Sequence, residues 1–386
     1  MIEIYEELRS AQIDEMLVNV YQKNSEIVYT GVIQYLSSAD LVMDTYSDYG
    51  LRDGEVYLKI AGIEKVETDS YDIASMKDRI TFDEDSGIEL DENAELPVNL
   101  SDNLFLNIIN MLNAQENPAL IVTLNNEKLE YSEGMILDID SDQLKFNQIN
   151  KFNFNESKHV TIKFRDIVGI EFGGSELRLL KHSIEFVTPE NHIEPFTVED
   201  KDDIIQYIGG LEQSGKLFTL ETADDRKYFY VGSVVSQNAN ELVIRVVDMS
   251  GRFGGYVWLR YDDIKRLVLE SDYLTILRNY VYDNWNSQHF TLQGLNAQRD
   301  FDDNDNILLN ILSQAVHFHK VMRFELTGNQ DLLGVPEVIY SKTGSVKIRL
   351  IDIDDDGLLT KEVGIETIKE VAFDYFKAFL LENHID

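Results

Sequence analysis

The sequence contains no cysteine and only 5 prolines in 386 residues. Without thiols the chain has no disulfide, no thiolate zinc site and no cysteine nucleophile. No apolar run approaches the roughly 18 residues that a membrane-spanning helix needs. The first residues, MIEIYEELRSAQIDEML, are acidic and lack the basic and apolar regions of a secretory signal. We therefore expect a cytoplasmic protein with no membrane partner.

Basic residues are also scarce. The chain has 34 Lys and Arg against 70 Asp and Glu, which gives a formal net charge of −36. Nucleic-acid binding draws most of its affinity from cations that neutralise phosphates, so this balance disfavours nucleic acid as a partner. It favours a basic protein partner, a cation, or solubility alone.

The motifs of common catalytic sites are missing as well. The sequence has no G-x-S-x-G, Walker A, G-x-G-x-x-G or H-E-x-x-H motif. Carboxylates are so numerous that no pair can be singled out as general acid and base. A protein without enzymatic activity and without a cofactor is therefore the favoured interpretation.

Two landmarks recur four times along the chain and indicate an internal repeat. The first is a glycine that precedes an apolar run by about ten residues. The second is an Ile-x-x-apolar pattern, whose isoleucines are separated by 104, 97 and 104 residues. The glycines are Gly31, Gly134, Gly232 and Gly334, and the isoleucines are Ile63, Ile167, Ile264 and Ile368.

A third landmark, upstream of the glycine, is an apolar stripe at helical spacing. It begins at Met1, Phe105, Ile204 and Leu308. Acids or amides that suit helix N-caps precede three of these stripes, at Ser101-Asp102, Asp202-Asp203 and Asp303 to Asn306. A second helical stripe follows the repeat in segments such as YLTILRNYV and YFKAFLLENH.

Between these landmarks the residues are typical of β-strands. In the third repeat, LFTLET, RKYFYVGSVVS, ELVIRVVD, GYVWLRY and KRLVLE are β-branched and aromatic runs separated by turn residues. Each glycine is expected where a strand bends sharply. We predict a mainly β chain with short helices (α+β), made of four tandem modules, each a helix followed by a five-stranded bent β-barrel. The expected modules span 1–82, 98–196, 197–292 and 300–386, with an acidic linker at 83–97.

This pattern resembles the Sm-like barrel of Sm proteins and of the bacterial Sm-like RNA chaperone. The resemblance is in the helix, the bent strands and the glycine that opens the second strand; a generic SH3-like barrel is the alternative. The stretches that correspond to the Sm base-binding motif do not repeat its aspartate and asparagine, so the resemblance does not imply RNA binding. They are LVMDTY, LKFNQI, LVIRVV and VKIRLI.

Two segments carry possible metal ligands. Asp352, Asp354 and Asp356 followed by Gly357 match the opening half of a calcium loop, but the twelfth position is Val363 instead of glutamate. The alternative is an acidic turn between two strands. His317 and His319 would share one face of a strand, yet zinc needs three or four ligands. The other histidines are scattered.

The third module holds the remaining candidate site. Aromatic residues with arginine are typical of interaction hot spots, and also of platforms that stack single-stranded nucleic acid. The residues are Arg245, Arg252, Phe253, Tyr256, Trp258 and Arg260. In the alternative, Trp258 lies in the core and the bases pair with acids; Trp285 is expected after the closing helix. The sequence favours a non-enzymatic scaffold or interaction protein, with nucleic-acid binding by this module or an enzyme with an inter-module site as alternatives.

Overall fold

The computed structural model describes residues 2–86, 103–212, 214–223, 229–302, 306–328, 330–351 and 359–385. The chain divides into two compact units, Met1–His192 and Ile193–Asp386, called unit 1 and unit 2. In the described residues, no helix combines the length and apolarity needed to cross a bilayer.

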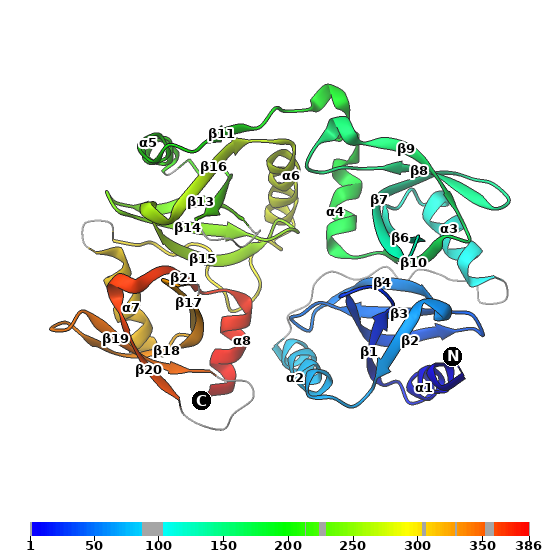
Figure 1. The fold of residues 1–386 in the computed structure, drawn as a ribbon, viewed down its shortest axis with the longest axis horizontal. Helices are drawn as coiled ribbons and strands as arrows, with labels where there is room; N and C mark the ends of the chain where they lie inside the picture. The colour runs from blue at the N-terminus through cyan, green and yellow to red at the C-terminus, as the bar shows by residue number, and fades with distance from the viewer. Residues whose placement is uncertain are drawn as a thin grey trace. The chain divides into compact units, whose positions relative to one another are not determined.

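Unit 1 holds one antiparallel sheet of ten strands in the order β5-β1-β2-β3-β4-β10-β6-β7-β8-β9 (Figure 1). Short 3₁₀ turns lie at Ile60–Gly62, Phe154–Glu156, Ile184–Phe186 and Pro189–Asn191. The other elements are α1 (Ile2–Ile13), β1 (Leu17–Gln22), β2 (Val28–Leu36), β3 (Asp40–Tyr46), β4 (Arg52–Lys59), β5 (Ile63–Glu67), α2 (Tyr71–Ser86), α3 (Leu104–Ala114), β6 (Ala119–Asn125), β7 (Lys128–Ile139), β8 (Gln143–Gln148), β9 (Lys158–Lys163), β10 (Ile167–Phe172) and α4 (Ser175–Ser183).

Unit 2 holds an antiparallel sheet of eleven strands in the order β11-β16-β12-β13-β14-β15-β21-β17-β18-β19-β20 (Figure 1). Its 3₁₀ turns lie at Tyr261–Asp263 and Ile365–Thr367. The other elements are β11 (Phe196–Val198), α5 (Lys201–Leu211), β12 (Phe218–Thr222), β13 (Tyr230–Gln237), β14 (Glu241–Val247), β15 (Phe253–Arg260), β16 (Ile264–Glu270), α6 (Asp272–Asn286), α7 (Ile307–Phe318), β17 (Met322–Leu326), β18 (Gln330–Tyr340), β19 (Ser345–Leu350), β20 (Thr360–Gly364), β21 (Ile368–Phe373) and α8 (Phe376–Ile385).

Each sheet contains two successive groups of five strands, which we call the first to fourth strand groups: β1–β5, β6–β10, β12–β16 and β17–β21. Within a group the fifth strand pairs with the first, so the order is fifth, first, second, third, fourth. In each unit the fourth strand of one group pairs with the fifth strand of the next. The expected α+β class with a high strand content is therefore confirmed, whereas the compact division that the structure displays is into two units.

The apolar stripes predicted at helical spacing do form helices. In α3 and α7 the residues of the stripe are buried against the strands that follow. Asn306 caps α7 by accepting from the amide of Leu309, as expected, and Asp200 caps α5. The cap of α3 is Asn103, whereas Ser101 and Asp102 lie outside the described residues.

The landmark glycines all lie in the second strand of their groups, at points where the backbone of the third strand lies very close. A Cβ built on Gly31 would lie 1.8 Å from the carbonyl oxygen of Asp44 in β3. The same contact to a third-strand carbonyl oxygen would be 1.9 Å at Gly134, 2.5 Å at Gly232 and 2.3 Å at Gly334. A side chain has no room at any of these positions, which explains why glycine recurs there.

The apolar core of each unit continues across the boundary between its two strand groups. In unit 1, Val42 and Tyr57 of the first group are buried in the same cluster as Ile121 and Ile170 of the second. In unit 2, Ala372 of the fourth group joins the cluster built around Ile244 and Leu259 of the third. Neighbouring groups therefore share buried surface as well as backbone hydrogen bonds.

Three local expectations need correction. His317 lies in the last turn of helix α7 and His319 caps it at φ 55°, so the two histidines do not alternate along a strand. Trp285 lies within α6, not after it. Residues 83–86 of the expected linker belong to helix α2, while residues 87–97 lie outside the described residues.

Candidate interaction surfaces at the strand joints and edges

The two joints between strand groups, β4 with β10 and β15 with β21, have the same register. In unit 1 Leu58 pairs with Gly169, and in unit 2 Leu259 pairs with Glu370. Gly169 and Glu370 each lie two residues after the landmark isoleucine of their group, and Leu58 and Leu259 each lie five residues before theirs. The pairing rule is therefore the same in both units.

At the end of each joint, a basic side chain donates hydrogen bonds to carbonyl oxygens of the neighbouring strand group; we say that this residue locks the joint. Lys59, the last residue of β4, donates from Nζ to the carbonyl oxygen of Phe164 at 2.8 Å. Arg260, the last residue of β15, donates from Nη2 to the carbonyl oxygen of Ile365 at 2.9 Å and from Nη1 to that of Glu366 at 3.0 Å. Phe164 and Ile365 each precede their landmark isoleucine by three residues, so the two contacts are equivalent.

A tyrosine also crosses each joint. Tyr29 lies two residues before Gly31 and donates to Oε1 of Glu171 in β10 at 2.6 Å. Tyr230 lies two residues before Gly232 and donates to Oε1 of Glu370 in β21. Burial raises the pKa of both phenols, with the nearby glutamate adding to the effect, so each remains a hydrogen-bond donor at neutral pH.

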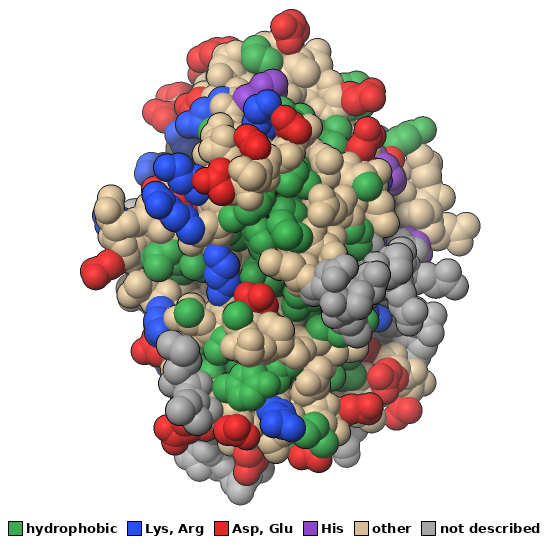
Figure 2. Space-filling model, turned by 90° about the vertical axis from the view of Figure 1, so that its right-hand side faces the viewer, with side chains coloured by type: hydrophobic (Ala, Val, Ile, Leu, Met, Phe, Trp, Pro, Cys, Tyr) green, Lys and Arg blue, Asp and Glu red, His purple; other side chains and the backbone are tan. Residues whose placement is uncertain are grey.

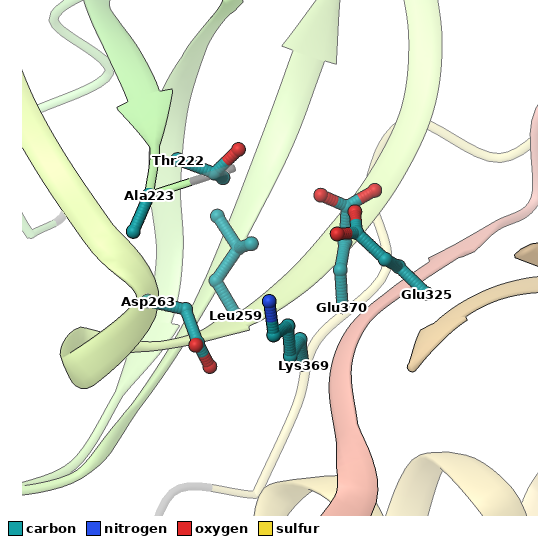
Figure 3. A pocket seen from close by; sticks show the side chains of 7 residues that line it. All are labelled: Thr222, Ala223, Leu259, Asp263, Glu325, Lys369 and Glu370. Atoms are coloured by element: carbon teal, nitrogen blue, oxygen red, sulfur yellow. The ribbon is translucent and has the colours of Figure 1, made fainter. Parts of the chain in front are cut away.

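The joint of unit 2 contains a small cleft that gathers charged side chains from two strand groups. Asp263 comes from the third group, while Glu325 and Glu370 come from the fourth and are direct neighbours in the β17–β21 pairing. Figure 3 shows their two carboxylates side by side, with Lys369 between them and Asp263. Arg323 compensates part of this charge by pairing with Glu370, and it donates to the Tyr230 hydroxyl at 2.7 Å.

The free volume of this cleft is about 10 Å³, which holds about one water molecule. Glu325 and Glu370 are both almost completely buried. Burial also raises the pKa of the Asp263 carboxyl, against the opposing charges of Lys369 and Arg260. The two strand groups are linked here by the hydrogen bond from Tyr230 to Glu370, beside a space of about one water molecule.

The aromatic and arginine residues singled out in the third strand group lie in or beside this joint. Trp258 and Tyr256 are buried on β15, where they face Val371 and Phe373 of β21. The Tyr256 and Phe373 rings stack with centroids 5.7 Å apart, and the Tyr256 hydroxyl donates to the carbonyl oxygen of Asn296 at 3.0 Å. This face of β15 is therefore packed against protein.

The other members of this set are held in place too. Phe253 and Arg252 are buried, and Phe253 packs edge-on against Tyr256. Arg245 donates to the carbonyl oxygen of Ala297 at 3.2 Å and to the hydroxyl of Ser233 at 3.3 Å. Arg260 donates to the carbonyl oxygens of Ile365 and Glu366 across the joint. The structure thus brings the six residues together, but as packed and bonded groups of unit 2.

The candidate calcium ligands Asp352, Asp354 and Asp356 lie outside the described residues. Elsewhere, in the part of the chain that the structure does describe, no cluster of three or more His, Asp or Glu side chains is placed to hold a metal ion.

The outer edges of the two sheets differ from one another. In unit 1 the terminal strands are β5 and β9. In unit 2 the terminal strands are β20 and the three-residue β11, which pairs with β16 through Thr197 to Val268 and Val198 to Leu267. These β16 positions correspond to the β21 residues that pair with β15. The short β11 therefore occupies an edge that, at the internal joints, receives a fourth strand.

The β9 edge of unit 1 is basic and grooved. Two adjoining open grooves of about 680 and 590 Å³ run along β7, β8 and β9, and both are lined by Tyr131, Gln148 and Lys158. The segment 143–166 has five Lys and Arg against two Asp and Glu, a reversal of the balance of the whole chain. Figure 2 shows Lys and Arg side chains gathered on the upper part of this side of unit 1, next to an area of hydrophobic side chains.

Sequence reasoning missed the basic residue that locks each joint, although a signal for it was present. Lys59, Lys163 and Arg260 all lie four residues before a landmark isoleucine, whereas the fourth strand group has Gly364 there. The role of this basic residue is evident only from the joints, where its side chain binds carbonyl oxygens of the neighbouring strand group.

The comparisons with known proteins add little. No protein-family model matches the chain, and no curated protein matches it. Among solved structures, the four MBT repeats of Drosophila melanogaster Sfmbt, in complex with a methyl-lysine peptide, align over 96% of this chain and 89% of that one. That alignment has 11% sequence identity and a TM-score of 0.11, values that do not establish a common fold.

Proposed function

We propose that this chain is a non-enzymatic acidic scaffold, built from four tandem Sm-like small-barrel modules, that binds other proteins through its strand edges. Each module consists of one of the four strand groups with the helix that precedes it. The observation that carries the proposal is the recurrence of one joint, in one register, in both units. The surface by which the groups bind each other is thus a repeated property of the module.

Two further observations support this proposal over the enzymatic alternative. The cleft that gathers charged residues from two strand groups admits about one water molecule. One of its acids, Glu370, is used within the fold, since it accepts from Tyr230 and pairs with Arg323. The net charge of −36 directs the scaffold towards basic protein surfaces and away from polyanions.

The experiment is site-specific photo-crosslinking in cells that express the full chain. A photoreactive amino acid replaces Thr161 on the exposed β9 edge, and in a matched control it replaces Glu3 on the exposed face of helix α1. Defined protein adducts from position 161 that are absent from position 3 are expected. Absence of protein adducts from position 161 would refute protein binding through this strand edge, and turnover of a metabolite by the purified chain would refute a non-enzymatic role.

Nucleic-acid binding by the third module is tested in parallel. The burial of Trp258 and the commitment of Arg260 to the joint leave that module few groups for stacking on bases. We expect no gel shift of single-stranded RNA at low salt. A shift that disappears in Arg252→Gln and Arg260→Gln variants, both still folded, would favour the nucleic-acid alternative.

A further inference from the structure

The β9 edge of unit 1 has a basic residue, Lys163, at the position of Lys59 and Arg260, but β9 is the terminal strand of its sheet. Lys163 is the last residue of β9 and lies four residues before Ile167, as Lys59 lies before Ile63 and Arg260 before Ile264. Lys59 and Arg260 both donate to carbonyl oxygens of a neighbouring strand group. The Lys163 side chain is exposed, and among the described residues its Nζ has no hydrogen-bond or ion-pair partner.

The β5 edge of unit 1 has the features of the strand that accepts the basic side chain at the internal joints. At both internal joints the acceptor is the fifth strand of a group together with the turn before it. β5 is such a strand, is terminal in its sheet, and follows the turn at Ile60–Gly62. Helix α2 follows β5 as α4 follows β10 and α8 follows β21, and neither α4 nor α8 prevents the pairing of those strands.

The other two outer edges do not fit the same rule. β16 is already covered by β11. β20 ends at Gly364, which has no side chain to donate to a carbonyl oxygen. Of the terminal strands in the described residues, only β9 ends in a basic side chain that can donate to a carbonyl oxygen. Only β5 is the fifth strand of its group.

We infer that β9 of one chain pairs with β5 of a second copy of the same chain, in the register of the internal joints and with Lys163 as the lock. This inference rests on the proposed function and names one partner of the scaffold. The register places Ile162 opposite Lys65, Thr161 opposite Val66 and Val160 opposite Glu67. Lys163 then lies beside Glu64, with its Nζ directed at the carbonyl oxygen of Ile60.

The charges of the two edges are complementary. β9 carries Lys158, His159 and Lys163 and no acid, while β5 carries Glu64 and Glu67 with Lys65. A strand edge that offers unpaired backbone groups adds another strand readily when the side chains agree. The contact is head-to-tail, because each chain contributes β9 to one neighbour and β5 to another, so it builds a ring or an open row of chains.

Sedimentation velocity of the full chain over a range of concentrations tests the inference. The wild-type chain is expected to form species larger than the monomer, in proportions that rise with concentration. Lys163→Glu and Glu64→Lys each place like charges at the contact and should weaken assembly by roughly tenfold or more. Lys128→Glu makes the same charge change on the inner strand β7 of the same sheet and should assemble like the wild type.

Mixing the two charge-reversed chains distinguishes a loss of strand pairing from a loss of folding. Mixing the Lys163→Glu chain with the Glu64→Lys chain restores opposite charges at every mixed contact, so assembly should return, while circular dichroism should show each variant folded. A wild-type chain that stays monomeric, or variants that assemble like the wild type, would overturn the inference. If the chain is monomeric but position 161 crosslinks a different protein, the inference fails and the proposed scaffold stands; if it crosslinks no protein, both fail.

Discussion

The hydroxyl of Tyr29 on β2 donates a 2.6 Å hydrogen bond to Oε1 of Glu171 on β10, across the boundary between two strand groups. Desolvation raises the pKa of Glu171, and the Tyr29 hydrogen bond opposes that shift by stabilising the charged form. The tyrosine therefore makes a buried carboxylate tolerable at the joint.

Tyr29→Phe should loosen the joint of unit 1. Loss of the donor leaves the buried carboxylate less satisfied and should cost about 1–3 kcal/mol of unfolding free energy at neutral pH. Because the folded pKa of Glu171 is already raised, its stabilising contribution is lost as pH rises, and the variant should lose more at neutral than at acidic pH. Hydrogen exchange of β10 amides measures the effect. Tyr21→Phe is the control, because it removes a 2.7 Å tyrosine hydrogen bond to Glu67 that stays within the first strand group; equal protection of β10 in both variants would contradict this role.

The landmark glycines should tolerate no side chain. In Gly232→Ala the new Cβ would lie 2.5 Å from the carbonyl oxygen of Arg245, so strands β13 and β14 must separate, at a cost of about 2–3 kcal/mol. Gly210→Ala in helix α5 meets no atom within 4 Å and should be neutral or stabilising by about 0.5–1 kcal/mol. Both tryptophans lie in unit 2, so denaturant unfolding followed by tryptophan fluorescence reports both variants. Equal midpoints would refute the steric explanation.

A buried carboxyl in helix α2 should make unit 1 less stable as pH rises. Asp83 is buried, and neither oxygen has a hydrogen-bond partner among the described residues. Desolvation raises its pKa to about 7, against the opposing charge of Arg79. Since the folded pKa exceeds the unfolded one, the contribution of Asp83 is fully present below about pH 4 and is lost as pH rises through 7.

Asp83→Asn should therefore stabilise unit 1 at pH 8, raising its melting temperature by a few degrees, and should have little effect at pH 4. Thermal melts followed by circular dichroism at both pH values measure this. Asp85→Asn, an exposed neighbour on the same helix, removes the same formal charge. A matching gain in that control would mean that general charge repulsion, not burial, is responsible.

The ion pair at the joint of unit 2 should behave as a buried one. Glu370 is almost completely buried, so Arg323→Met leaves its charge poorly compensated and should cost on the order of 3 kcal/mol. The double variant Arg323→Met with Glu370→Gln should recover much of that loss. Lys216→Met breaks the exposed pair with Glu270 and should cost less than about 1 kcal/mol. Tryptophan fluorescence during denaturation follows all three, and additive losses in the double variant would show that Arg323 and Glu370 are not coupled.

Much of the local structure could be predicted because its causes are local. The stripe that begins at Phe105 forms a helix since its apolar residues share one face, and Gly31 marks a close strand crossing that excludes Cβ. The prediction of a strand at His317 is wrong, because alternation over three residues does not distinguish a strand from the end of the helix that begins at Ile307.

The candidate site could not be predicted in the same way, because it depends on contacts between distant residues. Trp258 and Arg260 have the composition of an exposed hot spot. More than 100 residues later, however, β21 pairs with β15 at Trp258, and the turn before β21 accepts the hydrogen bonds of Arg260. The pairing of Glu325 with Glu370 likewise follows from the register of β17 and β21. Only the joint reveals that Lys59 and Arg260 play one role.

The long separation between paired strands matters during synthesis. Tyr57 of β4 pairs with Ile170 of β10, and Trp258 of β15 pairs with Val371 of β21, so each partner strand leaves the ribosome about 110 residues later. At elongation rates of about 5–20 residues per second, β4 and then β15 each wait roughly 5–20 seconds with a bare edge. During both intervals the nascent chain is open to mispairing, and the dense negative charge of its first hundred residues, with 23 acids and 7 bases, helps to keep neighbouring nascent chains apart.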